Sequence, residues 1–110
     1  MSARLTGQRI LVTSCTTFMG PPITELFRTE GADVIADDSQ LLEPDEPAAL
    51  IARCGELDAI VANLDIPAYG AKVADIDDEQ WIAGFDAMVH PLMRLVRAAA
   101  PTMATRGGGS

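Results

Sequence analysis

The residues best suited to chemistry lie in the first part of the chain, in a turn at residues 14–20 and in the acidic pair Asp37 and Asp38. The turn follows an apolar run at residues 10–13, and the acids follow a second apolar run at residues 34–36. A strand, turn, helix and strand in this order, with an acid about 20 positions beyond the turn, is typical of dinucleotide binding, where the acid binds a ribose hydroxyl. The spacing therefore predicts a βαβ nucleotide-binding unit.

The turn itself is poor in glycine. A pyrophosphate turn uses glycines for its bend, for close approach of the phosphates and for helix packing, and of these only the packing residue, Gly20, is present. Phe18 stands at the close-approach position, where its ring is expected to fill the volume of a phosphate. Pro21 and Pro22 each remove an N–H from the helix start that would hold an anion. Two interpretations follow: a closed cofactor site, or a divergent turn that still binds its cofactor.

Apolar spacing predicts the elements around this turn. Ile23, Leu26 and Phe27 recur at helical intervals, which indicates a helix from Pro21 that packs on a sheet with this face. Gly31 is expected to follow its last turn with a positive φ.

The segment after the acids is short. Only one helix, at about residues 46–53, and a short strand near residues 41–42 fit before the next apolar strand at residues 59–62. This shortening is a second reason to doubt dinucleotide binding. Asn63 follows that strand and is expected to tie neighbouring backbone.

A long helix is predicted from about Asp77, with Gln80 completing a capping box. Pro91 should bend this helix and Pro101 should end it. Its apolar residues form a wide stripe, which indicates core, with any excess joining a subunit interface. The stripe comprises Trp81, Phe85, Met88, Val89, Leu92, Leu95, Val96 and Ala99. His90, within this helix, is interpreted as a structural or interface residue and not as a base.

Composition limits the class of protein. The 110 residues fit one domain, and the net charge of −8 argues against a nucleic-acid partner. No apolar run approaches the length of a membrane span, and the N-terminus lacks the apolar core of a secretory signal. Cys15 and Cys54 have no metal-ligand spacing, so we expect reduced thiols, no metal site and a cytoplasmic protein.

These residues carry a family resemblance over almost the whole chain. The chain resembles the N-terminal half of the short-chain dehydrogenase/reductase superfamily, and within it the halohydrin dehalogenases, whose turn reads Thr-x4-Phe/Tyr-x-Gly. Residues 13–20 fit that pattern, and further matches lie at residues 31–37, 61–63 and 89–92. The resemblance implies an α/β, Rossmann-like, doubly wound parallel sheet of three to four strands with flanking helices.

The same resemblance implies that residues 1–110 are a truncated domain without its catalytic half. The family's serine, its tyrosine and the basic partner (lysine or arginine) lie beyond this region, so we assign no catalytic residue here. Tyr69 and Lys72 do not form the family's Tyr-x-x-x-Lys pair, because their spacing is one residue too short. Met88 stands where dehydrogenases of the superfamily place an asparagine of their proton relay. The final glycines, residues 107–109, are typical of the approach to a next strand and also resemble a linker.

Three functional hypotheses remain open. The first is a halohydrin dehalogenase-like protein that needs no cofactor, closes a vicinal haloalcohol to an epoxide and seats the halide near Thr13, Phe18, Met19 and Gly20. The second is an NAD-dependent oxidoreductase in which Asp37, Asp38 and Asn63 serve the cofactor. The third is a non-catalytic oligomerisation module. The resemblance also implies a homo-oligomer built through the long helix.

Overall fold

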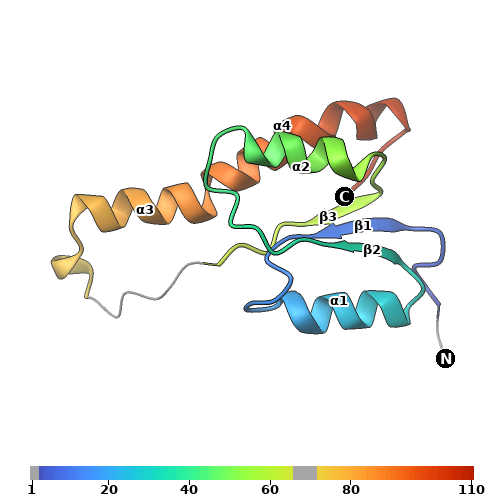
Figure 1. Cartoon of the computed structure of the whole chain (residues 1–110), viewed down its shortest axis with the longest axis horizontal. Helices are drawn as coiled ribbons and strands as arrows, with labels where there is room; N and C mark the ends of the chain where they lie inside the picture. The colour runs from blue at the N-terminus through green and yellow to red at the C-terminus, as the bar shows by residue number, and fades with distance from the viewer. Residues whose placement is uncertain (1–2, 66–71) are drawn as a thin grey trace.

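The computed structural model describes residues 3–65 and 72–110. Three parallel strands, β1 (Arg9–Val12), β2 (Asp33–Ala36) and β3 (Ala59–Val61), form one sheet in the order β2-β1-β3 (Figure 1). The central strand pairs Leu11 with Ile35 on one side and with Ile60 on the other. The predicted parallel α/β sheet is therefore confirmed.

Helices cover both faces of this sheet. α1 (Gly20–Thr29) lies on one face, and α2 (Glu46–Cys54) and α4 (His90–Thr105) lie on the other (Figure 1). Such double cover is what a parallel sheet with apolar residues on both faces requires. The main core fills the space between the sheet, α2 and α4. It comprises Leu11, Leu41, Leu50, Ile51, Cys54, Leu57, Leu95 and Ala99.

The helix α1 buries only part of the predicted face, because Ile23 and Phe27 are half-buried and Leu26 is not. Gly20 and Thr24 are its buried residues, whereas Leu26 is 52% exposed. The reason is that Gly20 has no side chain, so the start of α1 lies directly against the backbone of Ser14 and Cys15, and this close contact decides which face turns inward. The prediction for Leu26 was wrong.

The connection from β2 to β3 has one predicted and one unpredicted part. α2 confirms the predicted helix, but residues 41–42 form no strand. Leu41 instead adopts a φ of +59° and is buried in the core. Positive φ lies outside the β region of regular strands, so the burial of this one side chain replaces the expected pairing.

The predicted long helix is two helices. α3 (Asp78–Met88) begins with the predicted capping box, in which the Gln80 amide donates to the Asp77 carboxylate over 2.8 Å. The helix is interrupted at Val89, two residues before Pro91, and α4 begins at His90. Pro101 does not end α4, which continues to Thr105; a proline removes only one helical hydrogen bond.

The apolar stripe is only partly core. Leu95 and Ala99 are buried against the sheet, whereas Trp81 is 62% exposed and α3 has no buried residue. α3 extends away from the sheet, beyond α4 (Figure 1). The other exposed members of the stripe are Phe85, Met88, Val89, Leu92 and Val96. Within the described ranges, no helix is both long and apolar enough to cross a membrane.

Candidate functional site

The candidate site is the turn between β1 and α1, at the carboxyl edge of the parallel strands, where α/β sheets bind ligands. Ser14 has a φ of +44° and Phe18 a φ of +50°. Both values lie in the left-handed region that glycine adopts readily and other residues adopt at a penalty of roughly 1–2 kcal/mol. The turn has therefore kept a glycine-type backbone at two positions that carry side chains.

The side chain of Asn63 supports this backbone. Its Nδ2 donates to the carbonyl of Ser14 over 2.9 Å and to the carbonyl of Thr17 over 3.0 Å. The buried hydroxyl of Thr13 donates in turn to the carbonyl of Asn63 over 2.7 Å. The sequence-based expectation that Asn63 ties neighbouring backbone is confirmed, and its target is the turn itself.

Gly20 packs as predicted for the third glycine. A Cβ at this position would lie 2.4 Å from the carbonyl oxygen of Ser14 and 2.7 Å from the Cα of Cys15. The Gly20 amide donates to the carbonyl of Thr17 over 2.8 Å. Because Pro21 and Pro22 form the first turn of α1 and have no N–H, the helix start offers few backbone donors to an anion.

The four residues of the predicted halide pocket differ in exposure. Thr13 is fully buried behind the turn, while Phe18 is 74% exposed and Met19 is also exposed. An open hollow of about 510 Å³ does lie beside the turn, between α1 and the end of β2. It is lined by other residues, namely Cys15, Thr16, Pro21, Thr24, Glu25, Arg28, Thr29 and Ala36.

The acidic pair lies next to the turn, as its spacing predicts. The amide of Cys15 donates to the backbone carbonyl of Asp37 over 3.0 Å, which joins the end of β2 to the start of the turn. One carboxylate oxygen of Asp37, Oδ2, accepts from the amide of Ser39 over 3.1 Å and from its hydroxyl over 2.5 Å. Asp38 is exposed beside them. The pKa of the Cys15 thiol is raised by burial and then by the negative charge of Asp38.

Two residues of this site were missed by the sequence reasoning. Ser14 occupies the bend position of a glycine-rich turn, so its place in the pattern was the available signal. Ser39 fixes the Asp37 carboxylate, and an acid followed two positions later by serine is the signal for such a local turn.

The other singled-out residues lie away from the site or outside the described ranges. Tyr69 is in a segment that the structure does not describe, and Lys72 is exposed just before a short 3-10 helix, η1 (Val73–Asp75). His90 lies at the junction of α3 and α4, where its Nδ1 is 3.1 Å from the carboxylate of Asp86. This position agrees with a structural role for His90.

The chain has a curated relative. No family model matches it, but it is similar to a cis-2,3-dihydrobiphenyl-2,3-diol dehydrogenase of Paraburkholderia xenovorans (strain LB400). The two are 26% identical over 134 residues, which cover 94% of this chain and 48% of that protein.

Solved structures share the fold. A dehalogenation enzyme matches with a TM-score of 0.83 and 27% identity, over 96% of this chain and 52% of that one. L-sorbose reductase from Gluconobacter frateurii, complexed with NADPH and L-sorbose, matches with a TM-score of 0.84 over 99% of this chain and 52% of that one. At 22% identity this second likeness shows the fold alone. The chain spans about half the length of these proteins.

These relatives overturn one prediction. The expectation that the chain works without a cofactor is contradicted, because its curated relative is a dehydrogenase and a chain of the same fold was solved with NADPH. The physical reason for the error lies at Ser14 and Phe18: their side chains suggested a lost turn, but their backbone has kept the glycine-type conformation. In sequence and in fold, the chain is therefore similar to the N-terminal half of members of the short-chain dehydrogenase/reductase superfamily.

Proposed function

We propose that this chain is the NAD-binding half of a short-chain oxidoreductase with a divergent cofactor turn. The observation that carries the proposal is the backbone of the turn, with positive φ at Ser14 and Phe18 and with both flanking carbonyls tied by Asn63. A turn that had lost its ligand would have no need to keep two residues in a strained conformation. The site residues of this proposal stay predictions.

Asp37 is the residue best placed to hold the ribose. Its Oδ2 is engaged by Ser39, which leaves Oδ1 to accept hydrogen bonds from a ribose diol at the end of β2. Asp38 adds a second negative charge, which repels a 2′-phosphate and favours NAD over NADP. The pyrophosphate would lie along residues 14–20, which Asn63 positions. The cofactor, when bound, supplies hydride transfer.

Titration with NADH tests the proposal. The fluorescence of NADH should rise saturably when the chain is added, and Asp37→Asn should weaken the affinity about tenfold by removing the charge on the ribose hydroxyls. Asp33→Asn is the matched control, since Asp33 is an exposed carboxylate at the opposite end of β2 from Asp37. Equal affinities for both variants would contradict the assignment of Asp37.

A second candidate is a haloalcohol dehalogenase-like protein. Two observations favour it: residues 13–20 fit the dehalogenase turn, and a dehalogenation enzyme is 27% identical with a TM-score of 0.83. The halide would lie against the exposed ring of Phe18. Line broadening of bromide in ⁸¹Br NMR tests this idea. Broadening that Phe18→Ala abolishes would support it, and bromide signals indifferent to the chain would reject it.

Each of the two proposed functions implies its own substrate. The substrate would be a small molecule, either an alcohol or carbonyl compound for the oxidoreductase or a haloalcohol and its epoxide for the dehalogenase.

We also propose a homo-oligomer, because Trp81 and Phe85 on α3 and Leu92 and Val96 on α4 leave apolar surface exposed. An oligomerisation module without chemistry would use this same surface. The cytoplasmic location and the single domain at residues 1–110 stay predictions.

A further inference from the structure

The outer edge of β2 offers backbone groups to another strand. β2 lies beside β1 alone in the sheet order, and the amide of Asp37 donates to the carbonyl of Val12 over 3.0 Å. Because backbone groups alternate along a strand, the amides and carbonyls of Val34 and Ala36 face the opposite way, toward the outer edge. Within residues 3–65 and 72–110, no group forms a hydrogen bond with them. Such a row of backbone groups is a template for a further strand.

The chain's own connection from β2 to β3 supplies no strand to this edge. The structure describes this connection in full, and it forms α2 without any strand. Its residue Leu41 enters the core between the sheet, α2 and α4. No residue of β2 is buried, whereas three of the four residues of β1 are. The edge of β2 therefore stays accessible in the folded chain.

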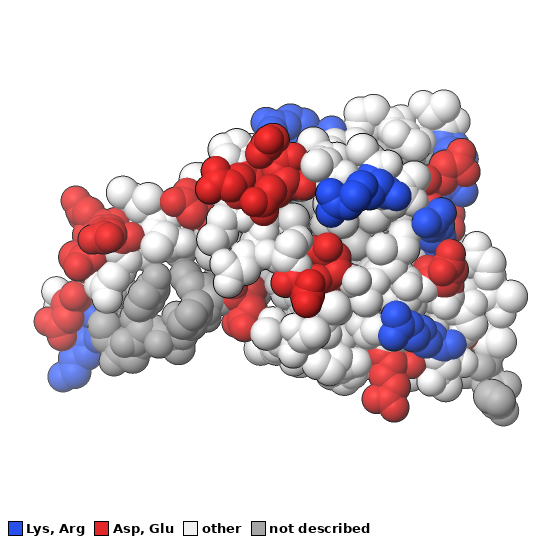
Figure 2. Space-filling view, viewed as in Figure 1, with Lys and Arg blue, Asp and Glu red and all other residues white. Residues whose placement is uncertain are grey.

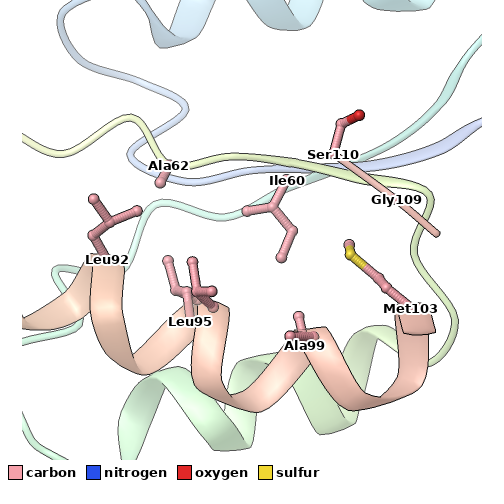
Figure 3. A pocket seen from close by; sticks show the side chains of 10 residues that line it. Ile60, Ala62, Leu92, Leu95, Ala99, Met103, Gly109 and Ser110 are labelled. Atoms are coloured by element: carbon pink, nitrogen blue, oxygen red, sulfur yellow. The ribbon is translucent and has the colours of Figure 1, made fainter. Parts of the chain in front are cut away.

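The opposite edge of the sheet has a different character. There the amide of Ile60 donates to the carbonyl of Ser110 over 2.9 Å, so the chain itself engages β3. An apolar hollow of about 160 Å³ lies between β3 and α4, and the side chain of Ile60 points toward it (Figure 3). The hollow of about 510 Å³ beside β2 is polar on its α1 side, which consists of Pro21, Thr24, Glu25, Arg28 and Thr29. The two edges therefore suit occupants of different chemistry.

The hollow beside β2 suits small, uncharged polar side chains. The hydroxyl of Thr24 is buried and has no hydrogen-bond partner among the described residues. A buried hydroxyl without a partner is unfavourable, and a second hydroxyl that enters the hollow can supply one. Glu25 and Arg28 line the same hollow with opposite charges, so their effects on a charged side chain offset each other. Ala36 also lines it, which places this face of β2 toward the hollow.

The other face of β2 favours a partner with basic and apolar side chains. Asp33, Ile35 and Asp37 stand at alternate positions and so share this face. Ile35 packs on the core. The side chain of Asp33 is 73% exposed, and its carboxylate is 3.6 Å from the Nε of Arg9. Opposite charges on directly facing residues of two strands stabilise the pair, and like charges destabilise it.

We propose that the outer edge of β2 binds an extended basic peptide as an antiparallel strand. Val34 and Ala36 each exchange two hydrogen bonds with one peptide residue, and antiparallel pairing is the slightly more stable form per residue. Basic side chains of the peptide lie opposite Asp33 and Asp37, an apolar one lies opposite Ile35, and small polar ones face the hollow. The main-chain bonds supply affinity and the charges supply selectivity. The inference concerns an interaction surface and does not depend on the cofactor proposal.

Three short peptides with blocked ends test the proposal by NMR titration of the folded chain. The first, Lys-Thr-Val-Thr-Lys, should shift the amide resonances of Val34 and Ala36 saturably. The second, Glu-Thr-Val-Thr-Glu, places like charges opposite the aspartates. The third, Lys-Pro-Val-Pro-Lys, keeps the charges but lacks the two N–H groups that face β2. Each of these two controls should bind at least about tenfold more weakly than the first peptide.

A pair of variants tests the charge on the side of the chain. Asp33→Asn should weaken binding of the lysine peptide about threefold, because it removes one facing charge. Asp78→Asn is the matched control, since it makes the same change of charge at an exposed position of α3. It should leave the affinity unchanged.

Four results would overturn the proposal. The first is the absence of any saturable shift with the lysine peptide, and the second is equal affinity for the lysine and glutamate peptides. The third is a shift at Ile60 and Ala62 in place of Val34 and Ala36, because the peptide would then lie on β3. The fourth is a shift at Val34 and Ala36 that grows with the concentration of the chain alone, since a second copy would then cover the edge. The amide of Leu11, in the central strand, is the internal control.

Discussion

The side-chain amide of Asn63 donates to the carbonyl of Ser14 over 2.9 Å and so joins the end of β3 to the first residue of the β1–α1 turn. Asn63 is almost fully buried. Its second hydrogen bond, to the carbonyl of Thr17, reaches the same turn three residues later. One side chain therefore fixes the shape of the turn from the neighbouring strand.

Replacing Asn63 should show how much these two hydrogen bonds contribute to the free energy of unfolding. Asn63→Leu keeps much of the side-chain volume but leaves two carbonyls without their donor, which should lower the free energy of unfolding by about 1–3 kcal/mol. Urea denaturation measures this change. Gln80→Leu is a control, since Gln80 makes its hydrogen bonds on an exposed helix end; its loss should be about 1 kcal/mol or less. A smaller loss for Asn63→Leu than for this control would contradict the role of Asn63.

Gly20→Ala should destabilise the chain through a steric clash. The new Cβ would lie 2.4 Å from the carbonyl oxygen of Ser14, so the turn or α1 must shift, at about 1–3 kcal/mol. Gly84→Ala in α3 is the matched control, because a Cβ there meets nothing within 4 Å. The control should gain about 0.5–1 kcal/mol from helix propensity. Thermal unfolding of both variants distinguishes a clash at Gly20 from a general effect of losing glycine.

Phe18→Gly should stabilise the turn, although it removes a large side chain. The φ of Phe18 is +50° and its ring is mostly exposed, so relief of backbone strain should outweigh the lost contacts by up to about 1 kcal/mol. Thr16→Gly, in the same turn and also exposed, should have the opposite effect, because Thr16 is not at positive φ. Chemical denaturation of the two variants should therefore move in opposite directions. Destabilisation by Phe18→Gly would show that its ring supports the fold.

The thiol of Cys54 should make stability fall at alkaline pH. Burial raises its pKa in the folded chain above the ordinary value of 9.0. The folded state therefore keeps the proton more tightly than the unfolded state, so this stabilising contribution is complete below pH 9 and is lost as the pH rises above it. Cys54→Ala should flatten the decline between pH 8.5 and pH 10.5, although it lowers stability at every pH by leaving a cavity. Parallel curves for the two proteins over this range would contradict the burial of the thiol.

The exposed surface of α3 should govern self-association. Trp81→Asp places a charge among exposed apolar side chains and should weaken any oligomer without affecting the fold, because α3 has no buried residue. Val73→Asp is the control, since Val73 is the most exposed of the large apolar residues described. Analytical ultracentrifugation measures the association. A monomer at all concentrations for the unmodified chain would remove the basis for the oligomer.

The surface charge of the protein bears on the expectation that nucleic acid is not its partner. Figure 2 shows carboxylates gathered over this face of the molecule, with fewer basic groups between them. Such a surface repels a phosphate backbone. A single nucleotide at the turn would bring far fewer phosphates than a nucleic-acid backbone, so this repulsion does not exclude it.

Local signals in the sequence predicted much of the fold. The order of strands and helices, the position of α2 and the capping box of Asp77 follow from patterns that neighbouring residues determine. The errors lie where tertiary contacts decide. Leu41 leaves its expected strand to fill the core, and Leu26 turns outward because the contact of Gly20 sets the orientation of α1.

At the candidate site too, local patterns in the sequence predicted some features, and tertiary contacts decided others. The placement of Asp37 beside the turn followed from spacing, and the support by Asn63 followed from its position after a strand. The backbone conformation of Ser14 and Phe18 could not be predicted from their side-chain types, because these types disfavour positive φ. That conformation is supported by hydrogen bonds from Asn63, which is distant in the sequence and follows β3, the strand next to β1 in the sheet.

The most direct test of the account is calorimetric titration of the folded chain with NAD⁺, with Asp37→Asn alongside. The account predicts saturable binding at one site, weakened about tenfold in the variant. No binding heat from a chain whose circular dichroism shows the native helices and strands would contradict the claim that the turn between β1 and α1 holds a dinucleotide.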